Sequence, residues 1–121
     1  MILYGIRNCD TMKKAQAWLQ VHAFEYRMHD YRRDGLEAQR LQDWCSRLGW
    51  QALINTRGTT WRRLTPEQQS IATTADAVRL MLEQPALIRR PVLETPEGRL
   101  LIGFEPQRYV DFLKTGLPHQ A

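Results

Sequence analysis

The apolar positions near the N-terminus predict a short buried strand that leads directly into a helix. Residues 2–4 are apolar in a row and stop at Gly5, which is typical of a buried strand ending in a turn. Apolar residues then recur at helical spacing over residues 12–21. Asp10 or Thr11 can serve as the N-cap of this helix, so a turn separates the two elements.

The next stretch predicts a second strand and a second helix. Residues 24–31 alternate loosely between apolar and polar side chains, which favours a strand. Residues 32–35 are expected to form a polar turn. Apolar residues at helical spacing over 36–48, followed by Gly49, then predict a helix that ends at this glycine.

The middle of the chain favours short helices. Residues 51–64 contain Gly, Asn and Thr, which predict a loop or a series of short helical turns. Residues 65–67 carry a Pro at an early helical position and start a short helix. Thr74 or Asp76 begins another helix, which stops before Pro85.

The C-terminal part predicts a hairpin followed by a closing helix. Residues 92–103 read as two strands joined by turn residues, and residues 106–115 as a helix that ends at Gly116. Residues 117–121 are expected to fray. The order β-α-β, helices, β-β-α predicts one α/β domain, whose mixed four-stranded sheet combines a parallel crossover pair with an antiparallel hairpin.

Composition narrows the classes of function. The net charge of +4 and pI near 9.4 come from basic residues spread over the chain. This distribution favours a solvated surface with a small anion site over nucleic-acid binding. The first residues lack the pattern of a signal peptide, and no apolar window reaches the ~18 residues of a membrane span. We therefore expect a cytoplasmic protein without a membrane partner.

The cysteines and histidines argue against a disulfide or a metal site. The two cysteines are Cys9 and Cys45, there is no C-x-x-C, and the three histidines are scattered. No metal is predicted. Cys45 lies on the apolar side of the predicted 36–48 helix, which favours a place in the core.

Cys9 follows the first strand and comes at or just before the first helix. Unpaired N–H groups and the helix dipole favour an anion there, and such a position lowers the pKa of a thiol. Arg7, Lys13 and Lys14 supply cations nearby in the sequence. Position alone leaves two interpretations open, because a free cysteine can also be an inert apolar residue.

Three separated segments, residues 5–15, 55–61 and 87–92, make the chain resemble the arsenate reductase (ArsC)-like family, and within it the YffB/Spx branch. The resemblance covers about residues 1–115.

The resemblance implies a thioredoxin-like fold interrupted by a helical insertion. The thioredoxin-like core would comprise about residues 1–35 and 86–116, and the insertion about residues 36–85. Thioredoxin-like folds place a cis proline beside the reactive cysteine, so we expect a cis bond at Arg90-Pro91.

The resemblance also implies a site. Cys9 would be the nucleophile, and Arg57 and Arg90 would hold an oxyanion, with Asn8 and Pro91 as further substrate-binding residues. A guanidinium presents a planar fork of donors that suits an oxyanion or a carboxylate and stabilises a thiolate. The alternative for either arginine taken singly is a solvated surface charge.

Two departures from the family pattern shape the expected chemistry. Arsenate reductases carry a third arginine in the last strand, whereas residues 101–104 here contain none, and Arg99 lies earlier. There is also no second cysteine just after Cys9, so an external thiol should resolve any intermediate. We expect a thiol oxidoreductase with no bound cofactor, glutathione as co-substrate, and an oxidised sulfur or an oxyanion as its target.

Two alternatives remain open. Spx proteins of the same branch act by gripping RNA polymerase, so the chain could be a binding module. True arsenate reduction is the other, although the missing third arginine argues against it.

Overall fold

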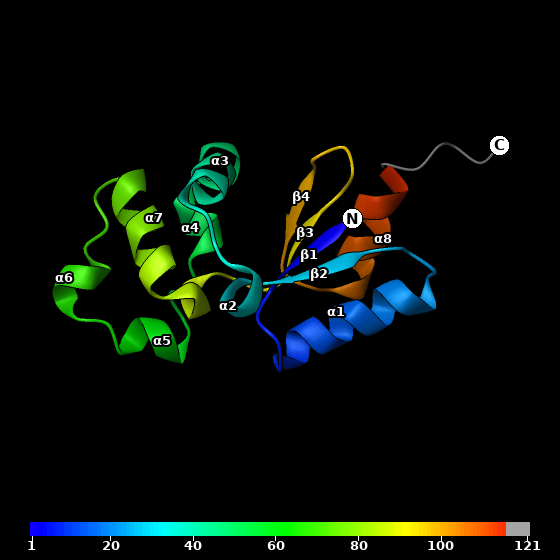
Figure 1. The fold of residues 1–121 in the computed structure, drawn as a ribbon, viewed down its shortest axis with the longest axis horizontal. Helices are drawn as coiled ribbons and strands as arrows, with labels where there is room; N and C mark the ends of the chain where they lie inside the picture. The colour runs from blue at the N-terminus through cyan, green and yellow to red at the C-terminus, as the bar shows by residue number, and fades with distance from the viewer. Residues whose placement is uncertain (116–121) are drawn as a thin grey trace. The chain divides into compact units, whose positions relative to one another are not determined.

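The structure is a computed structural model, and it describes residues 1–115. The chain divides into two compact units (Figure 1). The first comprises Met1–Met28 and the chain from Arg90 onward, and the second comprises His29–Arg89. Within the described residues, no helix is long and apolar enough to cross a membrane.

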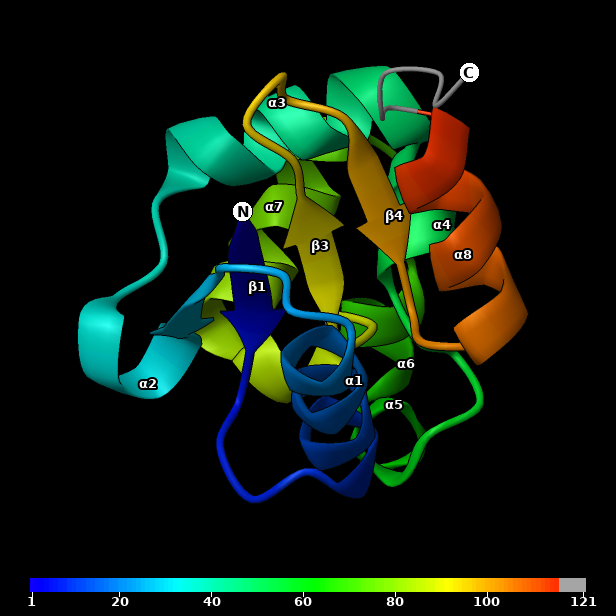
Figure 2. The ribbon, with the colours of Figure 1, turned by 90° about the vertical axis from the view of Figure 1, so that its right-hand side faces the viewer.

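The sheet has four strands in the order β2-β1-β3-β4 (Figure 2). The strands are β1 (Ile2–Gly5), β2 (Arg27–Asp30), β3 (Val92–Glu94) and β4 (Leu100–Ile102). Two helices, α1 (Asp10–Val21) and α8 (Pro106–Thr115), belong to the first unit. The predicted mixed four-stranded sheet and its C-terminal hairpin are confirmed.

The strand register brings three chain segments together at one end of the strands. Strand β3 pairs antiparallel with β1 on one side and with β4 on the other, with Tyr4 opposite Val92 and Val92 opposite Ile102. At that end the chain leaves β1 toward α1, enters β3 and leaves β4. The Gly103 N–H donates to the Pro91 carbonyl oxygen at 2.8 Å, which extends the pairing of β3 and β4 by one step.

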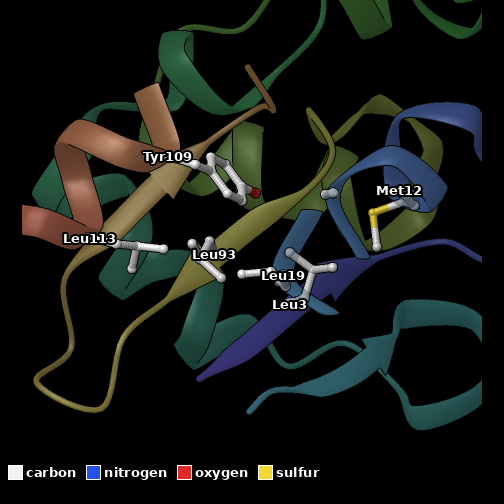
Figure 3. Packing of buried hydrophobic residues seen from close by; sticks show 7 residues of the cluster. Leu3, Met12, Leu19, Leu93, Tyr109 and Leu113 are labelled. Carbon is white, nitrogen blue, oxygen red and sulfur yellow. The ribbon is translucent and has the colours of Figure 1, made fainter. Parts of the chain in front are cut away.

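The core of the first unit lies between the sheet and its two helices (Figure 3). Leu3 and Leu93 are register partners, so they point to the same face of the sheet. The apolar sides of α1 and α8 cover that face. The buried cluster consists of Leu3, Met12, Ala15, Leu19, Leu93, Tyr109 and Leu113. Burying these side chains, at about 1.5 to 3 kcal/mol for each large one, fixes α1 and α8 against the strands.

The second unit is helical. Its elements are α2 (Tyr31–Asp34), α3 (Ala38–Leu48), α4 (Trp50–Leu53), α5 (Thr59–Arg62), α6 (Pro66–Gln69), α7 (Thr74–Glu83) and the 3₁₀ turn η1 (Pro85–Leu87). Capping boxes at Thr65 and Thr73 satisfy the first N–H groups of α6 and α7. Leu41 and Trp44 of α3 are fully buried.

Several boundaries differ from those predicted. The second strand covers Arg27–Asp30 alone, and the expected polar turn at residues 32–35 is mostly the helical turn α2. Asp30 explains this change, because its side chain accepts the Arg32 N–H at 2.9 Å and so caps a helix. The predicted helix end at Gly116 and the expected fraying of residues 117–121 lie outside the described residues.

Candidate functional site

Cys9 is itself the N-cap of α1. We expected Asp10 or Thr11 in that role, and this was wrong. Cys9 has extended backbone angles (φ −99°, ψ 129°), and its carbonyl oxygen accepts the Lys13 N–H at 3.0 Å. Asn8 precedes it in the left-handed region, with φ 64°, which asparagine tolerates better than most residues. The turn therefore places the thiol next to the unpaired N–H groups of the first helical turn.

The surroundings of Cys9 favour its thiolate. Partial burial raises the pKa of the thiol, but hydrogen bonds from the Met12 backbone N–H, the Arg90 side chain and the Thr11 backbone N–H lower it, as does the Arg90 charge. Together the lowering contributions outweigh the effect of burial, so the pKa of Cys9 lies below that of an ordinary cysteine. A thiol ionised in this way is the reactive form for nucleophilic attack and disulfide exchange.

The cation beside the thiol is Arg90. The sequence pointed to Arg7, Lys13 and Lys14, whose side chains are exposed; the charge that lowers the Cys9 pKa is the partly buried Arg90 guanidinium instead. Arg90 lies two residues before the start of β3, and Arg90-Pro91 is a cis peptide, as predicted. The strand register thus brings together a residue of the first loop and one far along the chain.

A close contact between Gly5 and Met12 fixes the start of α1 against the end of β1. A Cβ atom at Gly5 would lie 2.3 Å from the Met12 Sδ and 2.7 Å from its Cε. Met12 is 1% exposed and packs in the core, while its backbone N–H lowers the pKa of the Cys9 thiol. Because Gly5 has no side chain, Met12 can pack in the core while its backbone lies beside Cys9.

Arg57 belongs to the second unit. It lies in the turn before α5, its backbone N–H donates to the Asn55 Oδ1 at 3.0 Å, and its side chain is exposed. This turn holds the arginine close to Gly58, the N-cap of α5. Its role toward Cys9 stays a prediction from the sequence.

Arg99 is engaged away from Cys9. Its Nη1 donates to the Phe112 carbonyl oxygen at 3.0 Å, and its guanidinium lies 4.5 Å from the centroid of the Phe112 ring. Arg99 precedes β4, at the end of the sheet opposite to the one where Gly103 leaves it. It serves α8 rather than an anion site.

Cys45 lies in the core, as predicted. It is 6% exposed on α3, and burial raises the pKa of its thiol. Such a thiol is a poor nucleophile at neutral pH. Among residues 1–115, no three His, Cys, Asp or Glu side chains gather as metal ligands.

Comparison with known proteins shows to which family this fold and this cysteine site belong. The profile of the ArsC family matches residues 4–112, so the chain belongs to the ArsC family. A solved structure named YFFB shares 47% identity at a TM-score of 0.85, covering 91% of this chain and 96% of that one. The solution structure of an arsenate reductase (ArsC) related protein from Brucella melitensis shares 44% identity at a TM-score of 0.75, covering 93% of both chains.

Sequence relatives fall into the same family. An uncharacterized protein of Haemophilus influenzae is 42% identical over 107 residues, which are 88% of this chain and 93% of the relative. The global transcriptional regulator Spx of Lactiplantibacillus plantarum is 25% identical over 115 residues, 93% of this chain and 86% of Spx. The chain is therefore similar both to arsenate reductase-like proteins and to regulators.

Proposed function

We propose that this protein is a glutathione-dependent thiol oxidoreductase of the arsenate reductase type, with Cys9 as its single nucleophile. The observation that carries the proposal is the place of Cys9 as the N-cap of α1, where the N–H groups of the first helical turn and the Arg90 side chain lower the pKa of its thiol. A structural cysteine gains nothing from a lowered pKa. A nucleophile that must be ionised near neutral pH does.

The proposed reaction has two balanced steps. The Cys9 thiolate attacks the glutathione sulfur of a disulfide between glutathione and a second thiol, forms a mixed disulfide with glutathione, and releases the second thiol as its thiolate, which takes up a proton. The thiolate of a second glutathione then attacks the mixed disulfide, restores the Cys9 thiolate and leaves as oxidised glutathione. Cys45 takes no part, because it is buried on α3.

Two arginines serve the anionic ligand in this proposal. Arg90 stabilises the thiolate of Cys9 and of the leaving thiol, because a guanidinium has five donors to share. Arg57, Asn8 and Pro91 complete the binding residues that the resemblance implies. For Arg57, the Arg57→Ala variant should bind an anionic thiol ligand roughly tenfold more weakly without unfolding, which is what losing one charge-assisted hydrogen bond is worth. Unchanged binding would leave Arg57 a surface charge.

Intact-mass analysis after incubation with oxidised glutathione tests the proposal. We expect one glutathionyl group on the wild type, none on Cys9→Ser and still one on Cys45→Ser, with reduced glutathione removing it. The matched serine variants separate the two thiols. A disulfide between Cys9 and Cys45 would contradict the buried place of Cys45, and no modification at all would contradict the proposed function.

A second candidate is a regulator that binds RNA polymerase. The similarity to Spx over 93% of this chain favours it, although no second cysteine follows Cys9 as a redox switch would need. Co-purification separates the two candidates, since a regulator would bring down polymerase and an enzyme would need only a small thiol. Arsenate reduction is a third candidate, and arsenate-dependent oxidation of glutathione would reveal it.

A further inference from the structure

A second guanidinium lies at the end of the strands where β1 leads to Cys9 and Arg90 leads into β3. Arg108, in the first turn of α8, donates from Nη1 to the Ile102 carbonyl oxygen at 3.2 Å. A Cβ atom at Gly103 would lie 3.8 Å from the same Nη1, so the guanidinium lies over this glycine. Within residues 1–115 this is the one hydrogen bond of the Arg108 side chain, and it makes no ion pair there.

Backbone pairing connects Arg108 to the thiolate site. Gly103 follows β4, and its N–H donates to Pro91 at 2.8 Å. Pro91 follows Arg90, and the pairing of Tyr4 with Val92 brings this segment to the end of β1, next to the turn that carries Cys9. The Arg90 side chain also lowers the pKa of the Cys9 thiol. A continuous series of contacts thus runs from Cys9 through Arg90 and Pro91 to Gly103 and Arg108, all within the first unit.

Gly103 keeps this position open. Its φ of +83° is favourable for glycine and costly for residues with a side chain, so the residue that follows β4 carries none, and the nearest heavy atom to a Cβ there would be the Arg108 Nη1. The helix α8 begins close to this end of β4 and runs back along the sheet (Figure 2). The first turn of α8 thus places the Arg108 side chain over Gly103, which has no side chain of its own.

The chemistry of the proposed co-substrate calls for such a cation. Glutathione carries its thiol in the middle and a carboxylate at each end, and a tripeptide spans roughly 10 Å. Arg90 acts on the sulfur, because its side chain lowers the pKa of the Cys9 thiol. A carboxylate away from the sulfur then needs another donor, and a guanidinium with four free N–H groups and no ion pair among the described residues suits it.

We propose that Arg108 is a substrate-binding residue of the Cys9 site, where its guanidinium holds a terminal carboxylate of the tripeptide thiol. The inference rests on the proposed function and adds to it the residue that selects a thiol with a remote carboxylate over a neutral one. Arg99 cannot do this, because it is bonded to Phe112 at the other end of the sheet.

Protection of Cys9 by S-methylglutathione, which cannot form a disulfide, tests the inference as binding alone. The ligand should slow alkylation of Cys9 by the neutral reagent iodoacetamide, and the concentration dependence gives its affinity. Arg108→Gln should weaken this affinity about two- to fivefold, within the range that exposed ion pairs contribute. Without ligand, its alkylation rate should equal that of the wild type, which shows that the fold and the thiolate are intact.

Lys114→Gln is the matched control. It removes the same charge from an exposed position of the same helix, about 9 Å further along its axis. Its affinity for S-methylglutathione should be that of the wild type. Equal weakening in both variants would indicate only net charge and would overturn the assignment, as would unchanged affinity in Arg108→Gln.

Failure of the proposed function gives a different result. If wild-type Cys9 is neither protected by S-methylglutathione nor modified by oxidised glutathione, both the function and the role of Arg108 are wrong. If the wild type is protected and modified but Arg108→Gln behaves identically, the function stands and the role of Arg108 alone is overturned.

Discussion

Replacing Arg90 with glutamine should make Cys9 react more slowly at neutral and acidic pH. Arg90 lowers the pKa of Cys9 through a hydrogen bond and through its charge. Glutamine keeps a donor amide of shorter reach and removes the charge. The thiol should then hold its proton to higher pH, and the reactive thiolate should become a smaller fraction of the protein.

The size of the effect follows from the kind of contact. A hydrogen bond to a charged group contributes about 1.5 to 3 kcal/mol. Cys9 is only partly buried, so solvent screening argues for the lower end of that range. This corresponds to roughly tenfold less thiolate at any pH below the pKa of the wild-type thiol. Well above the pKa of both forms the two proteins should no longer differ in their fraction of thiolate.

The assay is the rate of iodoacetamide modification of Cys9 from pH 5 to 10, measured by peptide mapping. Arg89→Gln is the control, because it removes an equal charge from the neighbouring exposed side chain. Its profile should match that of the wild type. Coincident profiles for Arg90→Gln and wild type would refute the reasoning, as would a shift of the same size in Arg89→Gln.

Three further predictions concern stability. Gly5→Ala should lower the free energy of unfolding by about 1 to 3 kcal/mol in urea titrations, because Met12 cannot leave the core to make room, and no change would contradict the tight contact. Tyr109→Phe should raise that free energy by about 1 kcal/mol, since its buried hydroxyl has no hydrogen-bond partner among the described residues; a loss of stability would show that a partner exists. The pKa of Cys9 is lower in the folded state than in the unfolded state, so the thiolate should stabilise the fold. The wild type should therefore be more stable than Cys9→Ser above the unfolded thiol pKa of about 8.5, and this advantage should disappear as the pH falls through the folded-state pKa. An advantage independent of pH would contradict the thiolate.

The order of elements could be predicted well from the sequence, because the spacing of apolar residues and the glycines and turn residues between them determine each element locally. The apolar run ending at Gly5, the helical spacing after it, and the turn chemistry of the C-terminal hairpin each correspond to an observed element. The N-cap of α1 was missed by one or two residues, because Cys9 takes the extended backbone angles of an N-cap itself and cysteine is not among the residues that usually cap a helix. Helix starts are the least certain part of such reasoning.

The partners of the nucleophile depended on contacts between distant residues. Arg90 was named through the family resemblance, whereas reasoning from proximity in the sequence chose Arg7 and the two lysines. Only the strand register places Arg90 beside the thiol. Arg108 gave no signal in the sequence, since an arginine in the first turn of a helix looks like any solvated charge. Its significance comes from the way β4 ends at Gly103.

The measurement that tests the central claim most directly is turnover of a mixed disulfide between glutathione and a peptide cysteine, with reduced glutathione in excess. We predict that oxidised glutathione forms at a rate proportional to the concentration of wild-type protein. Cys45→Ser should retain that rate, and Cys9→Ser should show only the uncatalysed rate that is measured without protein. A wild-type rate no faster than the buffer, or a Cys9→Ser variant that still turns over, would contradict Cys9 as the nucleophile of a glutathione-dependent oxidoreductase.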